Sequence, residues 1–139
     1  MIVASLMRRD IVTVPPEATV REAARVMRDR GVGAVIVARG DAPLGIVTER
    51  DLARRVLAAG LDPDATRAAA VMSTPLATIE PAASVEAAAE KMRRLRVKRL
   101  VVVLDGLVRG IVSTTDVAYA APALHKALVD GWVKARWEG

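Results

Sequence analysis

A stretch of seven residues occurs twice in this chain with similar chemical groups at matching positions. GIVTERD spans residues 45–51, and GIVSTTD spans residues 110–116. Each copy carries a hydroxyl and, three residues later, a carboxylate: Thr48 and Asp51 in the first, Ser113 and Asp116 in the second. A hydroxyl can donate to a phosphate oxygen, and an ionised carboxylate can accept from both hydroxyls of a ribose. The spacing therefore matches a phosphoribose group.

The same spacing also has a purely structural explanation. Each motif stands where an apolar strand is expected to give way to a helix, and a Thr or Ser at the helix start with an acid three residues on is a common cap. Such a cap stabilises the helix by about 1 kcal/mol without a ligand. Gly45 is equally consistent with a tight turn. A helix start also favours a bound anion, so from spacing alone both explanations stay open.

The repeated motif belongs to a longer internal repeat. A shift of 65 residues aligns the halves without a gap, so that Met7 aligns with Met72 and Gly45 with Gly110. Each half predicts the order strand–helix–strand–strand–helix. The expected strands are 11–14, 34–38, 44–47, 76–79, 99–104 and 107–112. The expected helices are 19–31, 49–60, 84–95 and 114–121.

Local signals support these boundaries. Thr19 and Glu22 have the spacing of a capping box, and Gly31 is a typical helix stop. The pattern predicts an α/β (α+β) protein, with two small sheets packed face to face as a pseudo-twofold pair. We expect domains over 1–65 and 66–121, a linker over 61–71, and a C-terminal helix over 122–139. The apolar stripe of that helix, Leu124, Leu128 and Trp132, either packs on the chain's own core or contacts a dimer mate or another protein.

The tandem copies, each closing on Gly, two apolar residues, Ser or Thr, and then Asp, resemble a pair of CBS (cystathionine β-synthase) domains, a Bateman module. The resemblance spans about residues 2–121 and includes the segments VTVPP and ATIEP. It implies an adenine nucleotide (AMP, ADP or ATP) in the cleft between the repeats, with the hydroxyl on phosphate, the carboxylate on ribose and the first strand near the base. The residues it implicates are Thr13, Val14, Thr48, Asp51, Thr78, Ile79, Ser113 and Asp116.

The two copies differ just before their second strands. Gly31-Val32-Gly33-Ala34 in the first copy becomes Arg96-Val97-Lys98-Arg99 in the second. The basic version resembles the phosphate-holding segment of the gamma subunits of AMP-activated kinase. We expect Lys98 and Arg99 to face the cleft and contact phosphates, with Arg50 a candidate of the same kind. The alternative is a solvated basic segment.

The overall charge ranks the possible ligands. The net charge is +5, with 21 Lys and Arg against 16 Asp and Glu. AMP, ADP and ATP are anions that suit a basic site, whereas S-adenosylmethionine brings a cation and fits less well. NAD remains possible.

The composition narrows the class of protein. The chain has no Cys, which excludes disulfides and thiolate metal sites, and its single histidine, His125, has no motif around it. Neither a Walker loop nor a Gly-x-Gly-x-x-Gly motif occurs, so we expect a binding module that is not an enzyme and holds no metal or catalytic cofactor. Its signal would pass to a separate effector protein. The resemblance implies a homodimer, and the short apolar runs and lack of a signal peptide favour a cytoplasmic protein without membrane contact.

Two alternatives remain. Nucleic-acid binding suits the basic balance, although the aromatics that usually stack bases are confined to Tyr119, Trp132 and Trp137. The other alternative is a ligand-free scaffold that dimerises through its helices.

Overall fold

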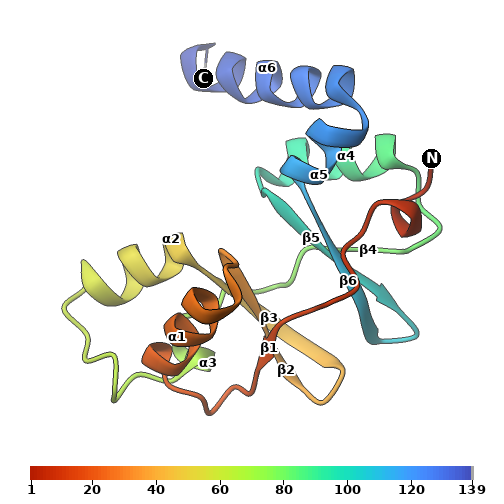
Figure 1. Cartoon of the computed structure of the whole chain (residues 1–139). Helices are drawn as coiled ribbons and strands as arrows, with labels where there is room; N and C mark the ends of the chain where they lie inside the picture. The colour runs from red at the N-terminus through yellow and green to blue at the C-terminus, as the bar shows by residue number, and fades with distance from the viewer. Residues whose placement is uncertain (139) are drawn as a thin grey trace. The chain divides into compact units, whose positions relative to one another are not determined.

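The chain folds into two compact units, shown in Figure 1 as a computed structural model. The structure describes the backbone of residues 1–138 and the side chains of residues 1–134. Unit 1 combines Met1–Asp10 with the chain from Ala77 onward, and unit 2 is Ile11–Leu76. The predicted domain boundaries follow the sequence repeat, whereas the units place the first ten residues with the second repeat.

Unit 2 is a three-stranded sheet with its helices (Figure 1). Its elements are β1 (Thr13–Val14), α1 (Val20–Arg30), β2 (Ala34–Arg39), β3 (Ala42–Thr48), α2 (Glu49–Asp51), a π-helical segment η2 (Leu52–Leu57) and α3 (Ala68–Val71). The strand order is β1-β2-β3, with β1 parallel and β3 antiparallel to β2.

Unit 1 repeats this architecture and adds a helix at the end of the chain. Its elements are η1 (Val3–Ser5), β4 (Thr78–Ile79), α4 (Val85–Leu95), β5 (Arg99–Leu104), β6 (Leu107–Ser113), α5 (Thr114–Ala120) and α6 (Pro122–Glu138). The strand order β4-β5-β6 has the same parallel and antiparallel pairings. The expected mixed fold, with strand–helix–strand–strand–helix written twice, is confirmed.

The helix signals read from the sequence act as expected in α1. The Glu22 backbone N–H donates to Thr19 Oγ1 at 3.1 Å, and the Glu22 carboxylate accepts from the Thr19 N–H at 2.9 Å. Gly31 ends α1 in the left-handed conformation, with φ of 65°. At the end of α4 the matching residue is Arg96, with φ of 55°. A side chain in that conformation costs about 1–2 kcal/mol, so the basic segment of unit 1 is kept despite some strain.

The segment that precedes each repeat packs on the other repeat. Residue 2 forms a bridge with Ser84 and Arg8 forms one with Ile111, while Arg67 pairs with Thr19 and Ser73 with Ile46. The linker expected over 61–71 therefore ends in a short helix, α3, that was not predicted from the sequence. Ala68, in α3, is fully buried, and its N–H donates to the Ala18 carbonyl at 2.7 Å.

The C-terminal helix α6 packs on the helices of unit 1. It lies against α4 and α5 (Figure 1), with Leu128 buried and Leu124 and Trp132 half-buried in the same apolar cluster. The indole N–H of Trp132 donates to the Arg93 carbonyl at 3.4 Å. Of the two uses expected for the stripe, packing on the chain's own core is confirmed. Trp137 lies outside the residues whose side chains are described.

Candidate functional site

In unit 2 the hydroxyl–carboxylate pair forms a capping box at the junction of β3 and α2. The Asp51 N–H donates to Thr48 Oγ1 at 3.1 Å, and the Thr48 N–H donates to Asp51 Oδ2 at 2.9 Å. Thr48 is half-buried, and Asp51 is 7% exposed. The structural explanation of the spacing is therefore correct, and it fixes the orientation of a buried carboxylate.

Unit 1 holds the second pair in the same way, where β6 meets α5. The Ser113 N–H donates to Asp116 Oδ2 at 2.8 Å, and the Asp116 N–H donates to Ser113 Oγ at 3.2 Å. The Ser113 hydroxyl also lies 2.9 Å from the same carboxylate oxygen. In both units the cap uses Oδ2, so the chemistry of the site depends on what surrounds Oδ1.

The other carboxylate oxygen has a different partner in each unit. Ser73 Oγ donates to Asp51 Oδ1 at 3.1 Å, whereas Arg8 Nε donates to Asp116 Oδ1 at 3.3 Å. Arg55 Nε also lies 3.7 Å from Asp51 Oδ1. None of these three partners was predicted from the sequence. The repeat contained the signal, because Arg8 and Ser73 directly follow the aligned residues Met7 and Met72.

The repeated glycine lets these partner segments come close. Gly45 and Gly110 lie within strands β3 and β6 and neither has a positive φ, so the tight-turn interpretation of Gly45 is wrong. A Cβ at Gly45 would lie 2.7 Å from the sulfur of Met72. A Cβ at Gly110 would lie 2.6 Å from the carbonyl oxygen of Arg8. Glycine is therefore needed because another segment crosses each strand at this position.

The two residues implicated in each first strand lie on opposite faces of their sheet. Side chains alternate across a sheet, and the register pairs Thr13 with Ile36 and Thr48 with Ala34, which places both threonines on one face. Val14 lies on the opposite face, buried in the helix-packed core. Thr78 and Ser113 share a face of the unit 1 sheet by the same register, and Ile79 packs against the core. The side chains of Val14 and Ile79 therefore do not lie on the hydroxyl-bearing face.

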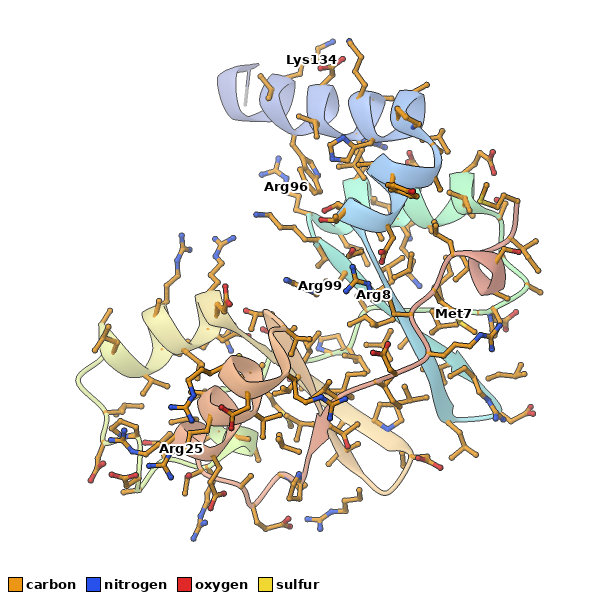
Figure 2. The ribbon with its side chains drawn as sticks, in the orientation of Figure 1. Met7, Arg8, Arg25, Arg96, Arg99 and Lys134 are labelled. Atoms are coloured by element: carbon orange, nitrogen blue, oxygen red, sulfur yellow. The ribbon has the colours of Figure 1, made fainter. Side chains whose placement is uncertain are left out.

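Two of the basic candidates lie next to the unit 1 pair. Arg99 is the register partner of Ser113 on β6, and the Lys98 carbonyl accepts from the Thr114 N–H at 2.9 Å. Figure 2 labels Arg8, which pairs with Asp116 from the N-terminal segment, and Arg99, at the start of β5. Arg50 is exposed on α2 of unit 2. The structure thus places Arg8 and Arg99 beside Ser113 and Asp116, and Lys98 adjoins this region through its backbone carbonyl.

Two hollows lie within single units, and neither is lined by Asp51 or Asp116. One, of about 740 Å³, is lined by Thr78, Ile79 and residues of α4, and Lys91 in it donates to the Thr78 carbonyl. The other, of about 570 Å³, lies between α1 and α2. Met27, which lines this hollow, aligns in the repeat with Met92 of unit 1. Met92 belongs to the buried cluster that contains Leu128 of α6.

The described residues contain no group of three or more His, Cys, Asp or Glu that could hold a metal ion. Among the described helices, none is both long and apolar enough to cross a bilayer. The candidate site is therefore a set of hydroxyls, carboxylates and cations, which are groups suited to hold a sugar phosphate.

Two three-stranded units, each closing on a hydroxyl–carboxylate pair, define a tandem CBS module, and the chain belongs to the CBS domain family. The CBS domain model matches residues 3–58 and 68–123. The chain is 36% identical over 116 residues to the CBS domain-containing protein YhcV of Bacillus subtilis, covering 84% of this chain and 82% of that protein. An uncharacterized protein of Methanopyrus kandleri is 38% identical over 124 residues, covering 88% of this chain. The match spans 63% of that relative's length.

A solved structure is similar over nearly the same range. The CBS domain protein PAE2072 from Pyrobaculum aerophilum, complexed with AMP, is 31% identical, with a TM-score of 0.81. The match covers 91% of this chain and 97% of that one.

The partner of the buried Asp51 gives a first testable prediction. Ser73→Ala removes the hydroxyl that donates to Asp51 Oδ1, and we expect it to lower the free energy of unfolding by about 1–2 kcal/mol, since the carboxylate is charged and buried. Urea denaturation followed by circular dichroism would measure the change. Ser5→Ala, the same substitution at an exposed serine of η1, is the control. Equal small losses in both variants would show that this hydrogen bond contributes nothing.

Proposed function

We propose that this chain is a regulatory module that binds adenine nucleotides through its two hydroxyl–carboxylate pairs. CBS-domain pairs are regulatory modules that often bind adenine nucleotides. The observation that carries the proposal is that Asp51 and Asp116, in separate units, are held in matching orientations by their caps. The AMP complex of the Pyrobaculum aerophilum relative supports the ligand class.

In this proposal each residue has a definite role. The Thr48 hydroxyl donates to a phosphate oxygen, and the Ser113 hydroxyl, which donates to Asp116 Oδ2 in the structure, turns to a phosphate oxygen when the nucleotide binds. Asp51 and Asp116 accept from the ribose hydroxyls. The first strands lie near the base, where Thr13 and Thr78 offer hydroxyls and the following residues, Val14 and Ile79, offer their backbone. Lys98, Arg99 and Arg50 supply positive charge for the phosphates.

The bound nucleotide would act as a signal and not as a substrate. A ligand shifts a conformational equilibrium only by its difference in affinity for the two shapes. The module would then transmit the nucleotide level to a separate effector protein, and a second copy of the chain is the expected dimer partner. AMP, ADP and ATP are the expected ligands, with NAD as a weaker candidate and S-adenosylmethionine the least suited.

A thermal-shift series tests the proposal. AMP, ADP or ATP at a hundredfold excess over its Kd should stabilise the chain by about 2.7 kcal/mol, and NAD and S-adenosylmethionine complete the series. Asp51→Asn and Asp116→Asn should each reduce the response, because an amide keeps one oxygen for the cap and loses the charge and the second acceptor. Glu22→Gln is the matched control, since Thr19 and Glu22 form the same box away from the two motifs.

The control separates a ligand site from a helix cap. If all three variants respond to nucleotide like the parent chain, both motifs serve only as caps. If no nucleotide stabilises the parent chain, the proposal is wrong. Binding of nucleic acid that weakens steeply with added salt would then favour the alternative suggested by the basic composition.

A further inference from the structure

The two carboxylates differ in the side chain that hydrogen-bonds to Oδ1. Asp116 pairs with the guanidinium of Arg8, whereas Asp51 accepts from the neutral hydroxyl of Ser73. The two partners occupy the same place in the repeat, one residue after the aligned methionines. The repeat therefore substitutes a cation for a hydroxyl at one point of the site.

Arg8 can serve a second anion while it holds Asp116. Only its Nε contacts the carboxylate, and the Arg8 side chain is 61% exposed. A guanidinium has five N–H donors in a planar fork, so its terminal nitrogens can donate elsewhere. Arg55, the arginine near Asp51, differs because its terminal nitrogen Nη1 already donates to the carbonyls of Val71 and Met72, at 3.2 and 3.3 Å.

Two further cations stand at the start of β5, next to the strand that carries Ser113. Arg99 stands opposite Ser113 on the sheet, and Lys98 precedes it. The matching residues in unit 2 are Ala34 and Gly33, which carry no charge. Conversely, the cation Arg50 of unit 2 aligns with the uncharged Thr115 of unit 1. Unit 1 thus offers Arg8, Lys98 and Arg99 near its motif. Unit 2 offers Arg50 and Arg55, and Arg55 already donates to backbone carbonyls.

We propose that Arg8 sets the ligand preference of unit 1, so that unit 1 favours a nucleoside triphosphate and unit 2 a nucleoside monophosphate. Each added phosphate brings negative charge, and a site with more cations gains more from it. Arg8 links the two parts of the ligand, because its Nε orients the ribose-binding carboxylate while its terminal nitrogens meet a phosphate. This inference rests on the proposed function, in which both motifs hold a nucleotide.

Reciprocal substitutions test this assignment, with AMP and ATP titrated by calorimetry. Asp51→Ala disables the unit 2 site, so that the remaining binding reports unit 1. Asp116→Ala disables the unit 1 site, so that the remaining binding reports unit 2. In the Asp51→Ala chain, Arg8→Ser should lower the ratio of ATP to AMP affinity by about tenfold, the effect of one charge-assisted hydrogen bond. In the Asp116→Ala chain, Ser73→Arg should raise that ratio by about the same factor.

Arg9→Ser is the matched control for Arg8. It removes the same charge from the next residue, whose guanidinium donates to the Ala4 carbonyl. If Arg9→Ser lowers the ratio as much as Arg8→Ser, the effect is general charge, and the assignment of Arg8 is wrong. An unchanged ratio in Arg8→Ser, with ATP still bound, also overturns the inference and leaves the proposed function intact. If the parent chain binds neither nucleotide, the proposed function and this inference both fail.

Discussion

Replacing Leu128 with alanine should lower the free energy of unfolding by about 2–5 kcal/mol, the range typical of buried leucines. Leu128 is 2% exposed and belongs to the same buried cluster as Met92 of α4 and Val117 of α5. The substitution removes apolar contacts and leaves a cavity between α6 and the two helices. Urea denaturation followed by circular dichroism would measure the loss.

Leu57 provides the matched control, because it is a leucine on a helical segment with 81% of its surface exposed. Leu57→Ala should change the free energy of unfolding by less than about 0.5 kcal/mol. If Leu128→Ala is as mild as Leu57→Ala, α6 is not anchored on unit 1. The stripe of Leu124, Leu128 and Trp132 would then be available to a dimer mate or another protein.

The elements of the fold were predictable because the sequence encodes them locally and twice. The capping box of Thr19 and Glu22 and the stop at Gly31 depend on neighbouring residues, and the structure confirms both. Helix α3 was missed because its Ala68 is fixed by a hydrogen bond to Ala18, a contact between segments far apart in sequence. The π-helical turn over Leu52–Leu57 was also missed, since nothing in its composition distinguishes it from an α-helix.

The candidate site was also predictable only where it depends on residues close in sequence. The geometry within each motif follows from spacing alone, because residues three apart at a helix start meet in a cap. The partners Arg8 and Ser73 could not be assigned from the spacing within the motifs. Each lies on the segment that precedes one repeat and packs on the other repeat. The burial of Val14 was readable in principle, because Val12, Thr13 and Val14 alternate apolar and polar, as in a strand with one buried face.

Gly110→Ala should also destabilise the chain, by about 1–3 kcal/mol, the usual cost of overpacking a tight contact. A Cβ at this position would lie 2.6 Å from the Arg8 carbonyl oxygen and 2.9 Å from the Met7 sulfur. The nearer obstacle is backbone, which is held against β6 by the hydrogen bonds between Arg8 and Ile111. In an unobstructed strand the same substitution would stabilise by about 0.5–1 kcal/mol, so the sign of the change reports the crossing segment.

Gly45→Ala is the informative comparison in unit 2. Its Cβ would meet the flexible side chain of Met72 at 2.7 Å and the backbone of Ser73 only at 3.0 Å, so we expect a smaller loss than at Gly110. Arg109→Ala, at an exposed neighbour in β6, should change stability by less than about 0.5 kcal/mol and serves as the control. A stabilised Gly110→Ala chain in urea denaturation would mean that the N-terminal segment does not lie on β6. The Arg8–Asp116 ion pair, which depends on that crossing, would then lose its structural basis.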